Sequence, residues 1–440
     1  MIRRMPLSRR TFLSSAGAAT AALGVRVSAQ TGPQLDRPSG EARTVASDEA
    51  YWQRVAAHYR VDRKINNLEA GYWGLMAAPI SDDYIRHVER VNRESSYYAR
   101  RTFPADLAAV RARVASYLRV DPDEIAFTRS ATESLQCLIS GYNRLKPGDA
   151  VLYADLDYPA MQNAMKWLAE RRGVKVIRFA IPEPATHDNV IGAYTGALDK
   201  NPHVRLVLLT HVSNKTGLVS PVATITALAR ARGADTIVDA AHAIGQMDIT
   251  VPDIGADFVG LNLHKWIGAP LGVAVFYIKK SRLADVDRWM GEEQSGADNI
   301  LTRVHTGTTN FAAFLTIPTA LDFHAAVGTA YKAARLRYLR DRWVSKVRDL
   351  ANVQVLTPDD PRMSAGMTGF RFKGRGTRQD VDAVVETLLT TYGIFTRRSA
   401  GIEGGDCVRV TPALYTTPAD VDRLATALHK MARSSSASAL

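Results

Sequence analysis

The sequence predicts an α/β protein with a large, mostly parallel β-sheet, followed by a smaller α+β domain. Short runs of β-branched and apolar residues alternate with longer amphipathic stretches, a pattern typical of parallel sheets with covering helices. The chain has 440 residues, more than one domain usually contains, so two packed domains are expected. Its 46% hydrophobic and 23% charged residues exclude a disordered chain and a coiled coil.

The large sheet is predicted to contain seven strands, at residues 125–128, 151–154, 174–179, 205–211, 236–239, 258–261 and 273–278. Helices are expected between them at 134–142, 161–171 and 222–232, and Gly233 suits the end of the last one. After Pro318 the pattern predicts a long helical stretch over 319–350. Segment 367–373, a helix over 378–392 and segment 407–411 then complete the small α+β domain.

The first 29 residues are predicted to be an export signal. Arg9 and Arg10 lie in a Ser-Arg-Arg-Thr-Phe-Leu segment that resembles the twin-arginine motif, and a weakly apolar run follows at 16–25. This run is too short to span a bilayer, which takes about 20 residues. Small residues at 27–29 suit a cleavage site. We therefore expect the twin-arginine export machinery as a partner, a periplasmic or secreted location, and no stable membrane insertion.

The net charge of +12 raises the question of an anionic partner. No run of consecutive basic residues with interleaved aromatics is present, so a nucleic-acid partner is not expected. The two cysteines, Cys137 and Cys407, are too few for a disulfide framework or a thiolate metal site, although one bridge is not excluded. No metal site is predicted.

Two polar residues follow buried strands and carry the predicted chemistry. Lys265 comes just after the strand at 258–261, and Asp239 ends the strand before it. The carboxyl ends of parallel strands line the ligand crevice of an open sheet, so both side chains are expected in one site. A desolvated lysine can form a Schiff base with a carbonyl cofactor, and a carboxylate can keep a pyridine nitrogen protonated. Taken singly, Lys265 also suits a surface lysine and Asp239 a turn cap.

Over residues 60–430 the ordered motifs resemble the aminotransferase class V enzymes of fold type I, and most closely the isopenicillin N epimerase group. The resemblance implies pyridoxal 5'-phosphate as cofactor, with Lys265 as the Schiff-base lysine and Asp239 as the partner of the pyridine nitrogen. His242 follows Asp239 at the family spacing and is expected near the ring, and His264 is expected to contact the cofactor beside Lys265.

The same resemblance assigns three further cofactor contacts. The Thr-Arg-Ser-Ala-Thr-Glu-Ser segment at 128–134 follows a strand and opens a helix, where the free N–H groups of Ala131 and Thr132 are expected to hold the phosphate. Tyr158 is expected to stack on the ring, although such a tyrosine also suits core packing. Asn214 is expected to donate to the phenolic oxygen, although its segment also reads as a simple turn.

Two more motifs concern the partner subunit and the substrate. Thr308, in a Gly-Thr-Thr segment, is expected to reach the cofactor phosphate of a second protomer, which implies a homodimer with shared active sites. Arg409 is expected to bind the carboxylate of a small-molecule amino substrate, since arginine suits a bidentate carboxylate contact.

The predicted organisation is a signal peptide at 1–29, a linker at 30–47, an N-terminal segment with the entrance loop at 48–80, a large cofactor-binding domain at 81–317, a small C-terminal domain at 318–432 and a disordered tail at 433–440. In the entrance loop, Glu69, Tyr72 and Trp73 depart from the family pattern. Cys407 lies in a predicted strand two residues before Arg409, which argues against the desulfurase reaction of the class.

The sequence thus predicts an exported enzyme that acts at the α-carbon of an amino acid or peptide-like amine, as an epimerase or an aminotransferase. Two alternatives remain at this point: a desulfurase-related lyase that lacks the catalytic cysteine, and a catalytically silent binding protein of the same fold.

Overall fold

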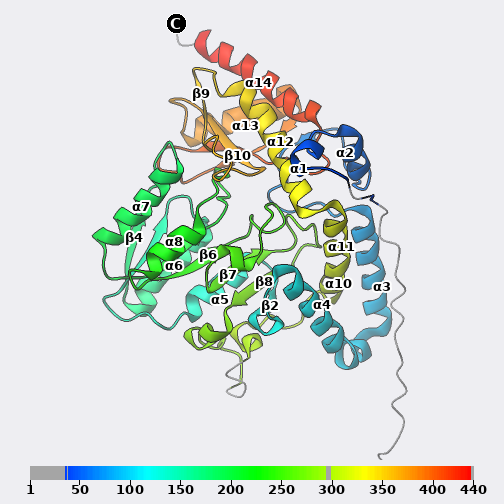
Figure 1. Ribbon diagram of the computed structural model, residues 1–440, viewed down its shortest axis with the longest axis vertical. Coiled ribbons are helices and arrows are strands. Elements are labelled where there is room, and N and C mark those ends of the chain that lie inside the picture. Colours follow the sequence, from blue (N-terminus) through cyan, green and yellow to red (C-terminus); the bar gives the residue numbers. More distant parts are fainter. Residues whose placement is uncertain (1–34, 37, 294–298, 438–440) are drawn as a thin grey trace, which may run out of the picture. The chain divides into compact units, whose positions relative to one another are not determined.

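The computed structural model describes residues 35–437, apart from 37 and 294–298, and these belong to one compact unit. The predicted export signal and the start of the linker lie outside the described residues. Within this unit a seven-stranded sheet lies beside a smaller four-stranded sheet (Figure 1).

The large sheet has the strand order β2-β8-β7-β6-β5-β3-β4. Six strands run in one direction and β8 runs against its neighbours β2 and β7, so the predicted mostly parallel seven-stranded sheet is confirmed. The strands are β2 (Ile125–Thr128), β3 (Ala150–Ala154), β4 (Lys175–Phe179), β5 (Val204–Thr210), β6 (Asp235–Asp239), β7 (Phe258–Asn262) and β8 (Ala274–Ile278).

Alternate residues of a strand point to opposite faces of the sheet, and in the central strands the side chains on both faces are buried. On β7, Phe258 belongs to the cluster formed with α5 and α6, whereas Val259 and Leu261 belong to the cluster on the other face. The helices of this part are α3 (Ala78–Arg101), α4 (Phe103–Leu118), α5 (Ala131–Gly141), α6 (Pro159–Arg172), α7 (His187–Lys200), α8 (Val222–Arg230), α9 (Val251–Ile254), α10 (Phe311–Leu315) and α11 (Ile317–Val327).

The small sheet has the order β12-β13-β10-β9 and a separate hydrophobic cluster that contains Trp343 and Phe370. A short parallel pair, β1 with β11, joins the N-terminal segment to this part. The elements here are β1 (Asn66–Asn67), β9 (Val353–Val355), β10 (Thr368–Phe372), β11 (Ile394–Phe395), β12 (Arg397–Ser399), β13 (Cys407–Val410), α12 (Thr329–Val347), α13 (Arg378–Tyr392) and α14 (Pro418–Ala437).

The long helical stretch predicted over 319–350 is divided into two helices, because the chain breaks at Gly328. This glycine has φ 84° and ψ 126°, outside the helical region, and the helical segment Phe311–Val327, which contains α10 and α11, meets α12 at 71°. The buried residues of α11 belong to the core of the large sheet, and those of α12 mostly to the small-sheet cluster. The change of core therefore falls at residue 328, not at the predicted boundary of 317/318.

Two predicted unstructured segments also differ from the structure. The predicted linker 30–47 contains α1 (Ala42–Val45), and Val45 and Ala46 are buried. α2 (Glu49–Ala56) follows, with Trp52 donating to the Val45 carbonyl at 2.7 Å. In the predicted disordered tail 433–440, α14 continues to Ala437, and 438–440 lie outside the described residues. In the predicted linker, the apolar contacts of Val45 and Ala46 outweigh the polar composition of the segment.

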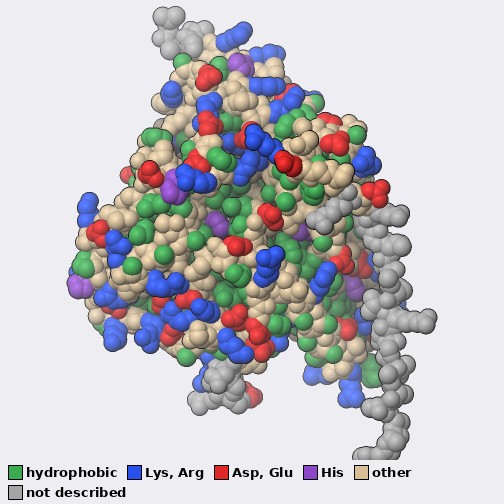
Figure 2. All heavy atoms as spheres, viewed as in Figure 1, with side chains coloured by type: hydrophobic (Ala, Val, Ile, Leu, Met, Phe, Trp, Pro, Cys, Tyr) green, Lys and Arg blue, Asp and Glu red, His purple; other side chains and the backbone are tan. Residues whose placement is uncertain are grey.

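Of the described helices, none is by itself long and apolar enough to cross a bilayer; the segment Phe311–Val327 and α12 meet that test only when joined across their bend. On the face shown in Figure 2, Lys and Arg side chains are interspersed with Asp and Glu.

Candidate active site

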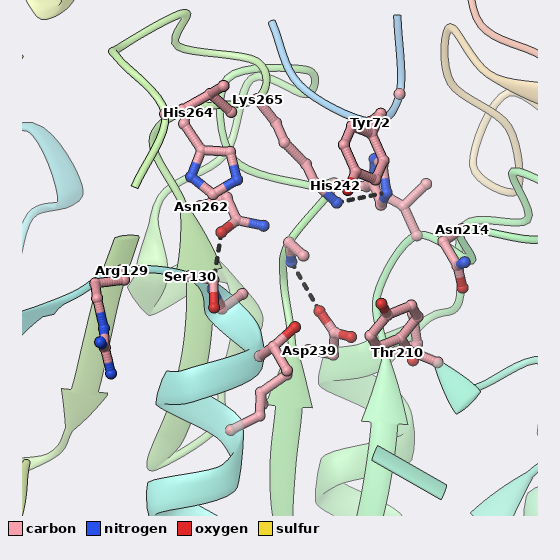
Figure 3. A pocket seen from close by; sticks show the side chains of 18 of the residues that line it. Tyr72, Arg129, Ser130, Thr210, Asn214, Asp239, His242, Asn262, His264 and Lys265 are labelled. Atoms are coloured by element: carbon pink, nitrogen blue, oxygen red, sulfur yellow. Dashed lines mark hydrogen bonds between the residues drawn. The ribbon is translucent and has the colours of Figure 1, made fainter. Parts of the chain in front are cut away.

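A cavity of about 340 Å³ lies where β5, β6 and β7 end and α5 begins. Nine of the ten predicted site residues line it: Ala131, Thr132, Tyr158, Asn214, Asp239, His242, His264, Lys265 and Arg409. The structure therefore brings together residues that are up to 278 positions apart, and Figure 3 shows most of them around one opening.

Lys265 and His242 point toward one another (Figure 3), with 3.0 Å between Nζ and Nε2. The indole N–H of Trp266 donates to His242 Nδ1 at 3.3 Å. Because an indole nitrogen is only a donor, the neutral imidazole carries its proton on Nε2 and donates it to Lys265. Burial, followed by the charge of Lys265, holds the pKa of His242 well below its usual value, which favours this neutral form.

Lys265 is itself prepared to lose its proton. Burial lowers its pKa to about 8, and Asp239 opposes that effect. Since His242 offers a hydrogen rather than a lone pair, the contact also favours the neutral amine. The residue is therefore a nucleophile at mildly alkaline pH, the property expected of a Schiff-base lysine.

Asp239 ends β6 and is buried. Its Oδ1 accepts the N–H of Ala241 at 2.9 Å, and burial raises its pKa. A buried carboxylate of this kind gains from a cationic partner, and Lys265 lies close enough to act on it. A protonated pyridine nitrogen would provide such a partner inside the cavity.

The beginning of α5 differs in one respect from the prediction. Ser130 caps the helix through Glu133, but the N–H of Ala131 is not free, because it donates to Asn262 Oδ1 at 2.8 Å. In the described part of the chain the N–H of Thr132 has no acceptor. The N–H of Thr132 is therefore available to donate to a phosphate at the positive end of the helix.

Asn262 is a site residue that the sequence analysis missed. It ends β7 and lines the cavity beside the start of α5. The available signal was its position: it is a polar residue at the carboxyl end of a strand whose other residues are all buried and mostly apolar.

Three other predicted contacts lie on the walls of the cavity. Asn214 has a buried side-chain oxygen without a hydrogen-bond partner among the described residues. Tyr158 precedes α6 and is 37% exposed, so it is not packed in the core. His264 Nδ1 contacts the Val273 carbonyl at 2.9 Å, and burial lowers the pKa of this histidine to about 4. These unsatisfied or accessible polar groups suit a ligand with several polar atoms.

Arg409 lies in the cavity, but its guanidinium is already bound. Its Nη2 and Nε contact the Glu69 carboxylate, and its Nη1 donates to the Asn214 carbonyl at 2.7 Å. The arginine and glutamate side chains are only 1% and 7% exposed. The charge of Arg409 is therefore neutralised by the same Glu69 that departs from the family pattern, and carboxylate binding by Arg409 stays a prediction.

The entrance loop is held close to this ion pair. A Cβ on Gly71 would come within 2.9 Å of Arg409 Nη2, and a Cβ on Gly74 would come within 1.8 Å of the Lys265 carbonyl oxygen. The N–H of Gly74 donates to the His264 carbonyl at 2.8 Å. Only glycine permits this approach, so the loop is fitted to the segment that carries Lys265.

Thr308 is the one predicted residue that does not line the cavity. It is exposed and neighbours Gly307 and Thr309, which line a different cavity of about 340 Å³. Its predicted contact with a second protomer stays a prediction.

Neither cysteine has the properties of a nucleophile. Both are free and buried, and burial raises the pKa of Cys407 to about 12. Nearby, the carbonyl of Gly401 accepts from Lys215 Nζ at 3.0 Å. Among the described residues, no group of three or more His, Cys, Asp or Glu side chains is arranged to hold a metal ion.

The family model for aminotransferase class-V matches residues 77–424, which is most of the chain. The chain belongs to the aminotransferase class-V family. Curated relatives agree: isopenicillin N epimerase of Streptomyces clavuligerus is 29% identical, covering 86% of this chain and 98% of the relative. A probable cysteine desulfurase of Vibrio cholerae is 28% identical, covering 80% of this chain and 88% of the relative.

Solved structures show the same fold. The cysteine desulfurase CsdA of Escherichia coli superposes with a TM-score of 0.71 at 21% identity, covering 86% of this chain and 98% of that one. A C-DES variant with glycine covalently linked to its pyridoxal phosphate superposes with a TM-score of 0.71 at 22% identity, covering 83% of this chain and 96% of that one. Fold type I, the enzyme class and pyridoxal phosphate as the family cofactor are thereby confirmed.

The residues of this class-V chain fit that cofactor. Lys265 and Asp239 lie in one cavity, the N–H of Thr132 at the start of α5 has no acceptor among the described residues, and the side-chain amide of Asn214, whose NH2 group is a donor, lines the same cavity. These groups match, in turn, a carbonyl, a pyridine nitrogen, a phosphate and a phenolic oxygen.

Proposed function

We propose that this class-V enzyme acts at the α-carbon of an amino acid or peptide-like amine, as an epimerase or an aminotransferase dependent on pyridoxal phosphate. The observation that carries the proposal is the arrangement of Lys265, His242 and Asp239 in one cavity. It joins an amine of lowered pKa to a buried carboxylate where two adjacent strands end.

Bound in this cavity, pyridoxal phosphate supplies a carbonyl for the substrate amine and a ring that withdraws electrons from the α-carbon. Lys265 Nζ, once free, is the base that takes the Cα proton, and its lowered pKa suits that task at mildly alkaline pH. His242 orients Nζ through the 3.0 Å contact. Asp239 would hold the proton on the pyridine nitrogen, and Thr132 and Asn214 would hold the phosphate and the phenolic oxygen and so fix the position of the ring.

Epimerisation and transamination share these residues and differ in where the proton returns. We place epimerisation first because the relatives named isopenicillin N epimerase cover nearly their whole length in the comparison. The desulfurase reaction is disfavoured because Cys407 is buried with a raised pKa.

We further propose that the enzyme is a homodimer and that it is exported. Thr308 is exposed, and so are three large apolar side chains of α3, which suit a contact with a second copy: Ile85, Val88 and Tyr97. Export rests on the twin-arginine pattern at Arg9 and Arg10.

Borohydride reduction tests the proposed site directly. Purified enzyme should absorb visible light, and reduction should fix the cofactor on Lys265, as identified by peptide mapping. In heavy water, an amino-acid substrate should gain deuterium at Cα; inverted product without a keto acid identifies an epimerase, and a keto acid identifies an aminotransferase. Labelling of another lysine, or of none, would contradict the proposal, and a Lys265→Ala variant is the matched control.

A further inference from the structure

A second pocket opens beside the candidate active site and shares two of its walls. It has a volume of about 480 Å³, and Tyr72 and Arg397 line both this pocket and the cavity of Lys265. We call it the side pocket. Its other walls include the apolar or aromatic side chains Trp73, Leu75, Phe395 and Tyr415 and the polar ones Arg60, Asp62, Asn67 and Glu69. A ligand in the cavity therefore has direct access to it.

The walls of the side pocket expose large apolar surfaces. Tyr72, Trp73 and Phe395 are 67%, 44% and 40% exposed. The rings of Tyr72 and Trp73 pack edge to face, with 5.2 Å between their centroids. Scattered exposed apolar side chains are common, but three aromatic rings around one hollow next to a reaction centre indicate a binding surface.

These walls are held in a fixed relation to Lys265. The Tyr72–Trp73 pair lies between Gly71 and Gly74, both of which pack tightly against the active site. Behind the pair, the N–H of Ala70 donates to the Thr411 carbonyl at 3.1 Å. On the other wall, Phe395 lies in β11, and its carbonyl accepts the N–H of Leu68 at 2.9 Å. The pocket is therefore built into the fold by several backbone hydrogen bonds.

The charge at the boundary of the two pockets is carried by Arg397. Arg409, beside it on the paired strand β13, is neutralised by Glu69. Within the described ranges Arg397 forms no ion pair; its Nε donates to the Arg398 carbonyl at 3.1 Å. An anionic ligand group that enters the cavity thus meets Arg397 as the uncompensated cation.

We propose that the substrate is an α-amino acid with an aromatic or bulky apolar side chain, that this side chain lies in the side pocket, and that Arg397 binds the carboxylate. The proposal rests on the function proposed above and adds the substrate class to it. Binding of the carboxylate at the boundary leaves the α-carbon toward Lys265 and the side chain toward the aromatic walls.

Calorimetric titration of the holoenzyme with unreactive ligands tests this proposal without turnover. We expect 3-phenylpropionate to bind at least tenfold more tightly than propionate, because the phenyl ring is buried between aromatic walls. Trp73→Ala and Phe395→Ala should each reduce this ratio by threefold or more, with propionate binding unchanged. Trp167→Ala, which removes an equally exposed tryptophan on α6, should leave the ratio intact.

Arg397→Gln should weaken the binding of 3-phenylpropionate and of propionate tenfold or more, and leave the binding of 3-phenylpropan-1-ol unchanged. Arg171→Gln, on the last turn of α6, is the matched control and should change neither. Visible absorption and circular dichroism show whether each variant keeps its cofactor and fold.

Equal affinity of the wild-type enzyme for 3-phenylpropionate and propionate would overturn the proposal that the side pocket binds an aromatic side chain. Unchanged acid binding in Arg397→Gln, with a large loss in Arg409→Lys, would overturn the assignment of Arg397 in favour of Arg409. Neither result affects the proposed function, which fails only if the visible band or the labelling of Lys265 is missing.

Discussion

Replacing Glu69 by Gln tests whether the buried ion pair with Arg409 keeps that arginine from ligands. The two side chains are 7% and 1% exposed, so the substitution leaves a guanidinium charge uncompensated in a dry site. Breaking a buried ion pair by removing one partner costs about 3–5 kcal/mol. Because Gln still accepts one hydrogen bond, we expect the lower end of that range.

The loss is measurable as a change in thermal stability. A change of 1 kcal/mol shifts Tm by about 2–4 °C in chains of 150–250 residues, and by roughly half of that in a chain of this length. Glu69→Gln should therefore lower the Tm of the holoenzyme by roughly 3–6 °C. The control is Asp82→Asn in the exposed Arg60–Asp82 pair, which should cost only about 0.2–1 kcal/mol.

The same variant should bind small carboxylates better, because Arg409 loses its compensating charge and at least one of its donors Nε and Nη2 no longer has an acceptor on residue 69. We expect propionate to raise the Tm of Glu69→Gln by several degrees more than that of the wild-type enzyme. If Glu69→Gln and Asp82→Asn melt within about 1 °C of each other and propionate stabilises them equally, the neutralisation of Arg409 by Glu69 is refuted.

Four further predictions follow from the site and the export pattern. In the apo-protein, attachment of pyridoxal phosphate should accelerate with rising pH around a midpoint near 8, because burial lowers the Lys265 pKa; stopped-flow absorbance that shows a midpoint above 10 would contradict this. Asp239→Ala should keep the cofactor on Lys265 but lose at least about a hundredfold in turnover, measured by deuterium exchange at Cα. Cys407→Ala should retain activity within about twofold, and iodoacetamide at pH 8 should leave the folded wild-type thiol unmodified, as mass spectrometry would show, because burial raises its pKa to about 12. Replacing Arg9 and Arg10 by Lys should leave the enzyme in the cytoplasm on fractionation, since lysine keeps the charge but lacks the guanidinium.

Those parts of the site that depend on local pattern were predictable from the sequence. Lys265 and Asp239 each follow a short apolar strand, and a parallel sheet places such residues at one edge. Thr132 follows a strand and a capping serine, which predicts a helix start. In these cases the nearest few residues determine both the element and its end.

Contacts between distant segments were not predictable in this way. Glu69 and Arg409 are 340 positions apart and meet because Glu69, just after β1, forms a parallel bridge with Thr411, just after β13. Asn262 reaches the N–H of Ala131 across 131 positions and removes a donor that appeared free in the sequence. The helix break at Gly328 is likewise a packing effect, since a single glycine inside an apolar pattern is compatible with either outcome.

The site also separates the residues of the reaction from those of substrate recognition. Asp239 and Asn262 end strands of the large sheet and Lys265 follows three residues after β7; solved structures of relatives share this fold. The walls of the side pocket come from the short β1–β11 pair and the chain next to it, segments 67–75 and 394–397. Substitutions in these two segments change the shape and charge that a substrate meets without altering the strands that carry Lys265. Differences in substrate among class-V enzymes of this type should therefore arise from these two segments, and exchanging them with those of a relative should change the preferred ligand while the cofactor remains on Lys265.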